Sequence, residues 1–253
     1  TLHQRYGKLP WKDVVEPARK LAFEGFPVGI FLHEKISQNL SEIRQSPLMA
    51  AVFLDGKGQP IEPGATLKQT NLGRTLAAVA EKGVKTFYQG EVAQKLVAAI
   101  QAAGGLIDQA DLRNYKVRHR NVIQSKAMGY EFLAMPPPSS GGAVILQALK
   151  ALDGIDLKAM GHNSDDYLHR LTEAMKHGFA DRARVMGDPD FVPVPIKDLI
   201  SDVAVQRVKD SFDPQKTLKR EAYGEPRHVG RDGGTSHLSV IDGSGNAVAL
   251  TTT

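Results

Sequence analysis

The chain has 253 residues, with no cysteine, 42% hydrophobic residues and 24% charged residues. This composition is typical of a globular protein, and it excludes a disordered chain, a collagen-like fibre, a disulfide framework and a cysteine nucleophile. The net charge is only +4, no basic run is interleaved with aromatic residues, and no run of about 18 apolar residues occurs. We therefore expect neither a nucleic-acid partner nor a membrane span in this chain.

The first half of the chain is predicted to be mainly helical. Apolar residues recur at helical spacing in four segments, 14–22, 30–43, 71–82 and 91–103. A short helical turn is predicted after them, over 108–115. Gly83 is the expected C-cap of the third of these segments. Residues 45–68 are rich in proline, glycine and aspartate, so we interpret them as loop with room for a short hairpin.

The second half begins with a change of pattern. Alternation in 116–134 predicts two strands, and the MPPPSSGG loop at 135–142 leads into a helix over 143–152. Ser164 is the predicted N-cap of a longer helix that extends to residue 184. Three prolines keep residues 187–195 extended, and a further helix is predicted over 197–210. Residues 211–234 are polar and lack apolar periodicity, so we predict an exposed, flexible linker there.

The segment 235–253, TSHLSVIDGSGNAVALTTT, predicts a β-hairpin. Residues 242–246 supply the aspartate, glycine and asparagine that a tight turn needs. A turn centred on Ser244 places His237 opposite Thr251 and Thr235 opposite Thr253, with opposed Cβ atoms about 5 Å apart. A slip of one residue would move the partner of Thr235 to the other face, so this inference depends on the register.

Thr235 has the sequence context of a self-activating nucleophile. A threonine hydroxyl needs a base, and the free α-amine of the same residue can serve once the preceding peptide bond is cut. Gly234 places little bulk beside that bond and tolerates strained backbone geometry. The same residues also fit a glycine-rich linker that enters a threonine-rich edge strand, and the local pattern alone favours this second interpretation.

Both ends of the chain suggest a piece of a longer protein. The chain begins with Thr1, and residues 1–20 contain no apolar segment of a signal peptide. It ends in a β-branched run without a turn or polar tail. The alternative is a C-terminal strand that docks at a sheet edge.

The whole chain resembles the gamma-glutamyltranspeptidase family. The segment GTSHLSVIDGSGNAVALTTT is similar to that family's processing and nucleophile segment. Five further blocks occur in the family's order: LHQRYGKLPW at 2–11, FYQG at 87–90, GG..D..DL..Y at 104–115, MPPPSSGG at 135–142 and ADR…GDPDFV at 180–192. The resemblance extends over all 253 residues.

This resemblance implies an α+β fold, namely part of the αββα sandwich of N-terminal nucleophile hydrolases with a helix-rich large-subunit portion. It implies a precursor that cuts itself between Gly234 and Thr235. Residues 1–234 would be the C-terminal part of the large subunit, with 211–234 as the pre-cleavage linker, and 235–253 the start of the small subunit. Thr235 would be the nucleophile and Thr253 would hydrogen-bond to it.

The implied reaction is acyl transfer from γ-glutamyl amides, such as glutathione, to water or amino acids, with no cofactor and no metal. The partners would be small γ-glutamyl peptides, the rest of the small subunit and the N-terminal part of the large subunit. The substrate-binding residues are expected outside this chain, and the uncut chain is expected to be inactive. The family also implies a periplasmic or secreted location. A related amidohydrolase or cephalosporin acylase, and a non-catalytic relative of the same fold, remain as alternatives.

Several other residues have two interpretations each. His237 lies on the same strand face as Thr235, so it is a candidate for a direct role, although the family's base is the free amine. Ser139 and Ser140 look like an oxyanion element, but they also fit a turn that packs a helix N-terminus. Candidates for metal binding have commoner explanations: turn hydrogen bonds for Asp188 and Asp190, and surface or capping positions for His162, His169 and His177.

Overall fold

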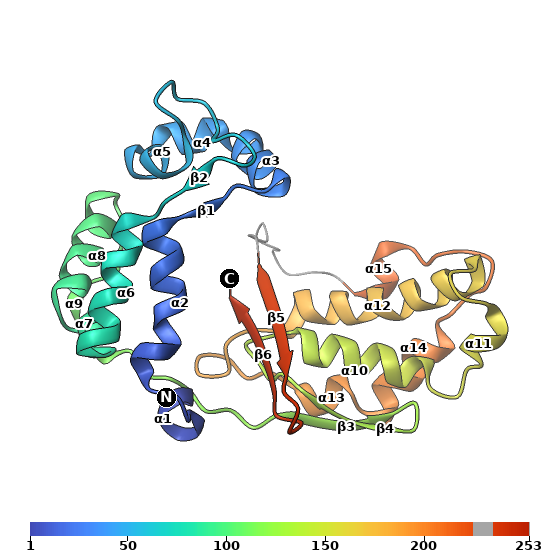
Figure 1. Cartoon of the computed structure of the whole chain (residues 1–253). Coiled ribbons are helices and arrows are strands. Elements are labelled where there is room, and N and C mark those ends of the chain that lie inside the picture. Colours follow the sequence, from blue (N-terminus) through green and yellow to red (C-terminus); the bar gives the residue numbers. More distant parts are fainter. Residues whose placement is uncertain (225–234, 253) are drawn as a thin grey trace. The chain divides into compact units, whose positions relative to one another are not determined.

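The computed structural model describes residues 1–224 and 235–252, which divide into two compact units, Thr1–Arg118 and His119–Thr253 (Figure 1). Across this described part, the strands form three separate two-stranded antiparallel sheets. No helix within it is both long enough and apolar enough to cross a bilayer.

The first unit is built on the pair α2 and α6. Its elements are α1 (Leu2–Tyr6), α2 (Trp11–Glu24), β1 (Phe26–Pro27), α3 (Ile30–Gln38), α4 (Leu40–Gln45), α5 (Pro47–Phe53), β2 (Thr66–Leu67), α6 (Thr70–Lys82), α7 (Lys85–Tyr88), α8 (Glu91–Ala102) and α9 (Gln109–Asn114). The Trp11 indole donates to the Val79 carbonyl at 3.0 Å and ties the start of α2 to α6. Gly25 has φ +88°, and a Cβ there would lie 2.4 Å from Thr66, so this glycine lets β1 approach β2.

Two predictions in this unit are wrong. The single helix expected over 30–43 is two helices, because the chain leaves helical geometry at Asn39 and that side chain bonds to the Lys35 carbonyl at 2.8 Å. The expected loop 45–68 contains α5, in which Ser46 caps the Met49 amide at 3.3 Å and Pro47 occupies the first turn. Proline is well accommodated there because its missing N–H would have no helical partner. The short hairpin expected in the same segment is present as the antiparallel bridge Leu54↔Pro60. The predicted helices over 71–82, 91–103 and 108–115 are confirmed as α6, α8 and α9.

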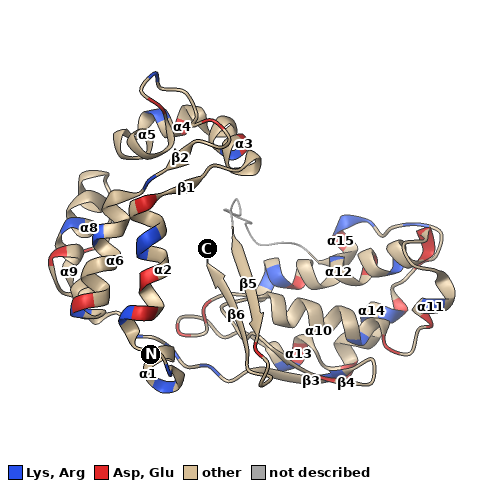
Figure 2. Cartoon of the chain, in the orientation of Figure 1, with Lys and Arg blue, Asp and Glu red and all other residues tan. Residues whose placement is uncertain are grey.

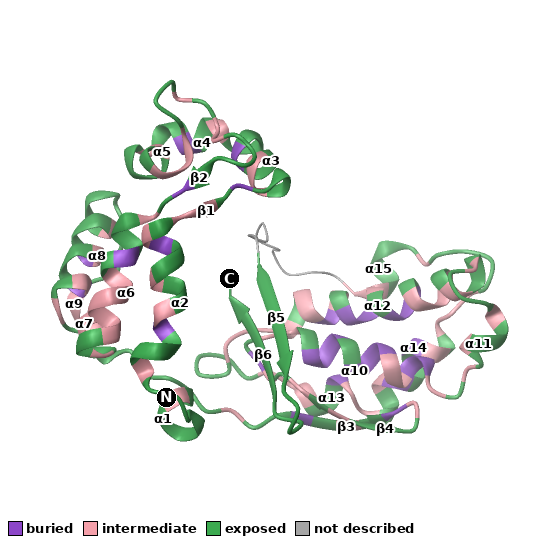
Figure 3. Ribbon diagram, viewed as in Figure 1, coloured by how far each residue is buried: buried purple, intermediate pink, exposed green. Residues whose placement is uncertain are grey.

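The second unit is built on the pair α10 and α12. Its elements are β3 (Ile123–Ala127), β4 (Tyr130–Ala134), α10 (Gly141–Leu152), α11 (Leu157–Met160), α12 (Asp165–Val185), α13 (Ile196–Leu199), α14 (Asp202–Asp210), α15 (Arg220–Tyr223), β5 (Ser236–Ile241) and β6 (Ala247–Thr252). Leu146 on α10 is fully buried. A Cβ at Gly178 would lie 2.9 Å from Val144, so the glycine allows α12 to approach α10 closely. Figure 3 shows the buried residues gathered along α10 and α12, whereas β5 and β6 are exposed throughout.

The predicted strands over 116–134 are confirmed in part as the hairpin β3–β4, whose turn places Met128 and Gly129 at positive φ. Ser164 caps α12 as predicted, because its hydroxyl accepts from the Tyr167 amide at 3.2 Å. The helix predicted over 197–210 is instead two helices, α13 and α14. The second begins at a new cap, where the Ser201 hydroxyl accepts from the Ala204 amide at 3.2 Å.

Residues 211–224 differ from the predicted linker in one respect. Most of them are exposed, as expected, but they contain α15 and are tied to α12 by side-chain hydrogen bonds. The linker was predicted because residues 211–234 lack apolar periodicity. This criterion does not detect a segment that is held in place by hydrogen bonds between polar side chains. The rest of the predicted linker, 225–234, lies outside the described residues.

Candidate functional site

The hairpin β5–β6 has the predicted register. His237 pairs with Thr251, Leu238 with Leu250, and the ladder runs from Ser236↔Thr252 to Ile241↔Ala247. The loop between the strands is therefore centred on Ser244, as the sequence predicts. A one-residue slip is excluded for this ladder.

Asp242 organises the turn. One carboxylate oxygen accepts from the backbone amides of Ser244 and Asn246, each at 2.9 Å, and the other accepts from the Asn246 side chain at 2.8 Å. Hydrogen bonds from Asn246, above all from its side chain, lower the pKa of Asp242. Gly245 has φ +81°, a conformation that favours glycine. The turn thus fixes the register by local chemistry.

Thr235 immediately precedes β5 and is exposed. Continued by one residue, the observed register would pair it with position 253. Gly234 and Thr253 lie outside the described residues, so the pairing of Thr235 with Thr253 stays a prediction.

His237 is held on the hairpin by two hydroxyl groups. Its Nδ1 lies 2.7 Å from the Thr251 hydroxyl and its Nε2 lies 3.1 Å from the Ser239 hydroxyl. A neutral imidazole has one donor and one acceptor nitrogen, so one hydroxyl accepts from the ring while the other donates to it. Successive side chains of an extended strand point to opposite faces, so residues 235, 237 and 239 share one face. Neither strand carries a lysine, arginine, aspartate or glutamate, and Figure 2 shows both in tan.

Ser139 and Ser140 lie just before α10. Ser140 occupies the N-cap position of this helix, and its side chain makes no capping hydrogen bond. A Cβ at Gly142 would lie 2.3 Å from the Met135 carbonyl oxygen, so the first turn of α10 packs tightly against the loop. This geometry supports the interpretation as a packed turn, and an oxyanion role for the two serines stays a prediction.

Asp188 and Asp190 make the predicted turn contact, since the Asp190 amide donates to Asp188 at 3.0 Å. Sequence reasoning missed Arg120, whose guanidinium donates to both carboxylates at 3.1 Å. Arg120 is about 70 positions from either partner, and no local pattern connects them. The prediction of an extended segment over 187–195 is wrong in part, because the Phe191 and Val192 amides donate to the Asp188 carbonyl at 3.0 and 2.9 Å and close a turn there. The aspartates therefore anchor this turn after α12 to the segment before β3.

His177 corrects the expectation of a surface or capping histidine, because it is only 4% exposed and bonds to the Ser211 hydroxyl at 2.9 Å. Burial, and then the Arg207 charge, lower its pKa, so the ring is neutral near pH 7. Next to it, Glu173 is also 4% exposed. Burial opposes ionisation of this carboxyl, but hydrogen bonds from Lys176, Thr217 and Tyr223 outweigh it and lower the pKa of Glu173 to about 2. Sequence reasoning named His177 but missed Glu173 and its partners.

Comparisons with known proteins agree on one family. The family model described as gamma-glutamyltranspeptidase matches residues 1–253. Glutathione hydrolase 2 of Arabidopsis thaliana is 40% identical over the whole of this chain and 44% of its own length. The acylase ACY 1 proenzyme of Pseudomonas sp. (strain V22) is 39% identical over 98% of this chain and 44% of its own length.

Among solved structures, the gamma-glutamyltranspeptidase of Helicobacter pylori superposes with a TM-score of 0.83 and 29% identity, covering 91% of this chain and 67% of that one. This likeness confirms the predicted α+β fold class, a partial N-terminal nucleophile hydrolase. The chain spans 44% of the length of the curated relatives named above. Since the family model matches every residue and a relative is 40% identical along the whole chain, the chain belongs to the gamma-glutamyltranspeptidase family, as its motifs predict.

Proposed function

We propose that this chain is part of a self-processing enzyme that cleaves γ-glutamyl amides, such as glutathione, and transfers the acyl group to water or amino acids. The observation that supports the proposal is the register of β5 and β6, whose ladder begins at Ser236↔Thr252, directly after Thr235. We propose that this pairing continues by one step to residues 235 and 253. The relative named glutathione hydrolase supports the reaction class. The relative named a proenzyme supports processing.

In the precursor, the Thr235 hydroxyl attacks the carbonyl carbon of Gly234 and loses its proton. The C–N bond of that peptide breaks, the acyl group moves to the hydroxyl oxygen as an ester, and the released nitrogen takes up the proton and becomes the α-amine of Thr235. Water then hydrolyses the ester, which leaves a carboxylate on Gly234 and restores the threonine hydroxyl. Until this happens the amine is part of an amide and cannot act as a base, so the uncut chain is inactive.

In the processed enzyme, the free amine takes the proton of the Thr235 hydroxyl as its oxygen attacks the γ-glutamyl carbonyl. The amide bond of the substrate breaks, and the leaving amine receives the proton. Water or an amino-acid amine then attacks the ester and releases the product, which gives ping-pong kinetics. The Thr253 hydroxyl donates a hydrogen bond to the nucleophile and orients it.

The proposed subunit division places 1–234 at the end of the large subunit and 235–253 at the start of the small subunit. The remaining parts of both subunits are the proposed partners and supply the groups that bind the substrate. A periplasmic or secreted location follows from the family resemblance. A related amidohydrolase or cephalosporin acylase is the second candidate function, because the relative named acylase ACY 1 is almost as similar to this chain as the glutathione hydrolase.

The test is processing of the full-length protein. We expect a gel to show two fragments and N-terminal sequencing to place the start of the smaller one at Thr235. Thr235→Ala should abolish the cut, and Thr253→Ala should slow it without unfolding the protein. Assays with γ-glutamyl and cephalosporin amides would then separate the two substrate classes. A full-length protein that is active without being cut would contradict the proposal.

A further inference from the structure

The β5–β6 hairpin presents two different faces. Side chains alternate along each strand, and residues paired across the ladder share a face. One face carries four aliphatic side chains in two cross-strand pairs, Leu238↔Leu250 and Val240↔Val248. From the middle of the ladder to its open end, the other face carries hydroxyl, imidazole and methyl groups: Thr235, His237, Ser239, Ala249 and Thr251. We call this second face the polar face, and it is the face of the proposed nucleophile.

A single imidazole links two hydroxyl groups of the polar face. The Nδ1 atom of His237 lies 2.7 Å from the Thr251 hydroxyl, and its Nε2 atom lies 3.1 Å from the Ser239 hydroxyl. Because both ring nitrogens are engaged, the ring cannot turn without breaking a hydrogen bond. In a neutral ring one nitrogen donates and the other accepts, so each tautomer gives the Thr251 hydroxyl one defined role. The ring therefore holds this hydroxyl in place.

The register places this held hydroxyl close to Thr235. Continued by one residue, the ladder makes Thr251 the diagonal neighbour of Thr235, while His237 is two positions along the same strand. Both separations are about 7 Å between Cα atoms. One water molecule spans the gap that remains between two hydroxyl groups across such a diagonal. Among the described residues, His237 and Thr251 are therefore the polar neighbours of the proposed nucleophile on its own face.

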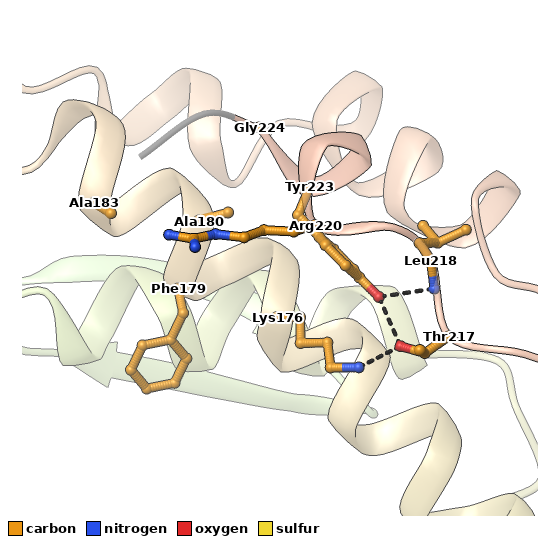
Figure 4. Close-up of a pocket in the computed structure, with 9 residues that line it drawn as sticks. All are labelled: Lys176, Phe179, Ala180, Ala183, Thr217, Leu218, Arg220, Tyr223 and Gly224. Carbon is orange, nitrogen blue, oxygen red and sulfur yellow. Dashed lines mark hydrogen bonds between the residues drawn. The ribbon is translucent and has the colours of Figure 1, made fainter. Parts of the chain in front are cut away.

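A hydrogen-bonded cluster elsewhere in the same unit shows the features of a stabilising network. Figure 4 shows Thr217 and Tyr223 pointing toward each other beside Lys176, along a groove on α12. All three donate to Glu173, which is only 4% exposed, and a carboxylate buried without these partners would destabilise the fold. The described residues of the polar face are all exposed, so their hydrogen bonds replace bonds to water and add little stability. The contacts of His237 therefore favour positioning over folding.

We propose that His237 and Thr251 are positioning residues for acyl transfer at Thr235. This inference rests on the proposed function. The imidazole holds the Thr251 hydroxyl, and that hydroxyl orients the nucleophile across the diagonal of the ladder through one bridging water. Neither residue exchanges a bond or a proton with the substrate, so their loss lowers the rate without removing the reaction. A nucleophile that is displaced by about 1 Å reacts up to about a hundredfold more slowly.

The experiment uses the full-length processed enzyme with a γ-glutamyl anilide, and kcat is expressed per small subunit quantified on a gel. His237→Ala and Thr251→Val should each lower kcat by a factor of about ten to a hundred. KM should stay within about twofold, because the groups that bind the substrate are proposed to lie elsewhere. A variant too slow to process is compared by its rate of self-cleavage, because Thr235 is the nucleophile of both reactions.

Two amide variants identify the ring nitrogen that matters. Asparagine places its amide where Nδ1 of the ring lies and so keeps a partner for Thr251. Glutamine places its amide where Nε2 lies and so keeps a partner for Ser239 only. We expect His237→Asn to retain most of the kcat and His237→Gln to be as slow as His237→Ala. A packing role predicts the opposite order, because glutamine is closer to histidine in size.

A double-mutant cycle tests whether His237 acts through Thr251. If the two residues acted independently, their losses would multiply, and two tenfold effects would give about a hundredfold. If the imidazole acts through the hydroxyl, the enzyme that carries both His237→Ala and Thr251→Val is no slower than the slower single variant. We expect the second result.

The matched control is Leu238→Ala, which removes a side chain from the aliphatic face of the same strand. It should lower the melting temperature and leave kcat per small subunit unchanged. The inference is overturned if Leu238→Ala lowers kcat as much as His237→Ala at an equal loss of melting temperature, if glutamine restores kcat better than asparagine, or if the losses multiply. If the unmodified protein neither cuts before Thr235 nor cleaves γ-glutamyl amides, the proposed function fails instead, which is a distinguishable result.

Discussion

The α10–α12 pair and the β5–β6 hairpin belong to the same compact unit but reach a defined geometry by different means. The helices enclose Leu146 and bury Glu173, His177 and Asp181 with their partners. The hairpin buries nothing among its described residues, and its register is set by Asp242 and the ladder. Stability is therefore concentrated in the helices, whereas the proposed nucleophile sits at the end of an element defined by local chemistry.

The largest expected difference is between identical truncations in the two regions. Leu146→Ala empties a fully buried position and should destabilise the chain by about 3 kcal/mol. Leu250→Ala removes a side chain that is 53% exposed and should change stability by less than about 1 kcal/mol. Urea unfolding of the 253-residue chain measures both. Equal losses would show that the hairpin is packed as firmly as the helices.

The pH dependence of unfolding should follow Glu173. Its pKa is near 2 when folded, against 4.5 as the ordinary value, so the folded state favours the ionised form. The resulting stabilisation is present above pH 4.5 and is lost as the pH falls toward 2. The largest possible stabilisation from this group is about 3 kcal/mol, because each unit of pKa difference between the folded and unfolded states corresponds to about 1.4 kcal/mol. Urea unfolding at pH 3 and pH 6 should therefore show a smaller difference for Glu173→Gln than for the unmodified chain, and an unchanged difference would contradict the assignment.

His177 should add a weaker dependence at higher pH. Its pKa is lowered in the folded state mainly by burial, while Asp181 and Glu173 oppose the shift. The unfolded chain therefore binds the proton more readily, and this contribution is present above pH 6.5 and is lost as the pH falls through the folded pKa. His177→Gln keeps a hydrogen-bond partner for Ser211. In this variant the free energy of unfolding should change less with pH just below pH 6.5 than in the unmodified chain. Titration of the imidazole by NMR gives an independent check, since a pKa above 6.5 would overturn the argument.

The contrast between the regions also explains what the sequence could predict. The hairpin register follows from residues within one short loop, and it was predicted without error for the described ladder. The same holds for the cap at Ser164, since its contact spans three positions. Signals of this kind are local, and a single sequence contains them.

The hydrogen bonds that tie residues 217–223 to α12 could not be predicted in this way. Thr217 and Tyr223 are 44 and 50 positions from Glu173, and only the packing of α12 brings them together. Their hydroxyls leave no apolar periodicity, so the segment had the composition of a linker. Pro47 led to a wrong prediction for a different reason. Proline was taken as a sign of loop, but it can also begin a helix, as it does in α5.

The smallest predicted effect isolates the hairpin. Asp242→Ala removes three hydrogen bonds to the turn, including both backbone amides that it orders. Amide exchange should accelerate at Val240 and Leu250, whereas α10 amides should keep their protection, because no described element other than the partner strand makes extensive contact with the hairpin. Asp242→Asn retains an acceptor oxygen for those amides. Its exchange rates at Val240 and Leu250 should therefore lie between those of the unmodified chain and those of Asp242→Ala. If α10 loses protection together with the hairpin, the two regions unfold as one unit, and the nucleophile strand shares the stability of the helical core.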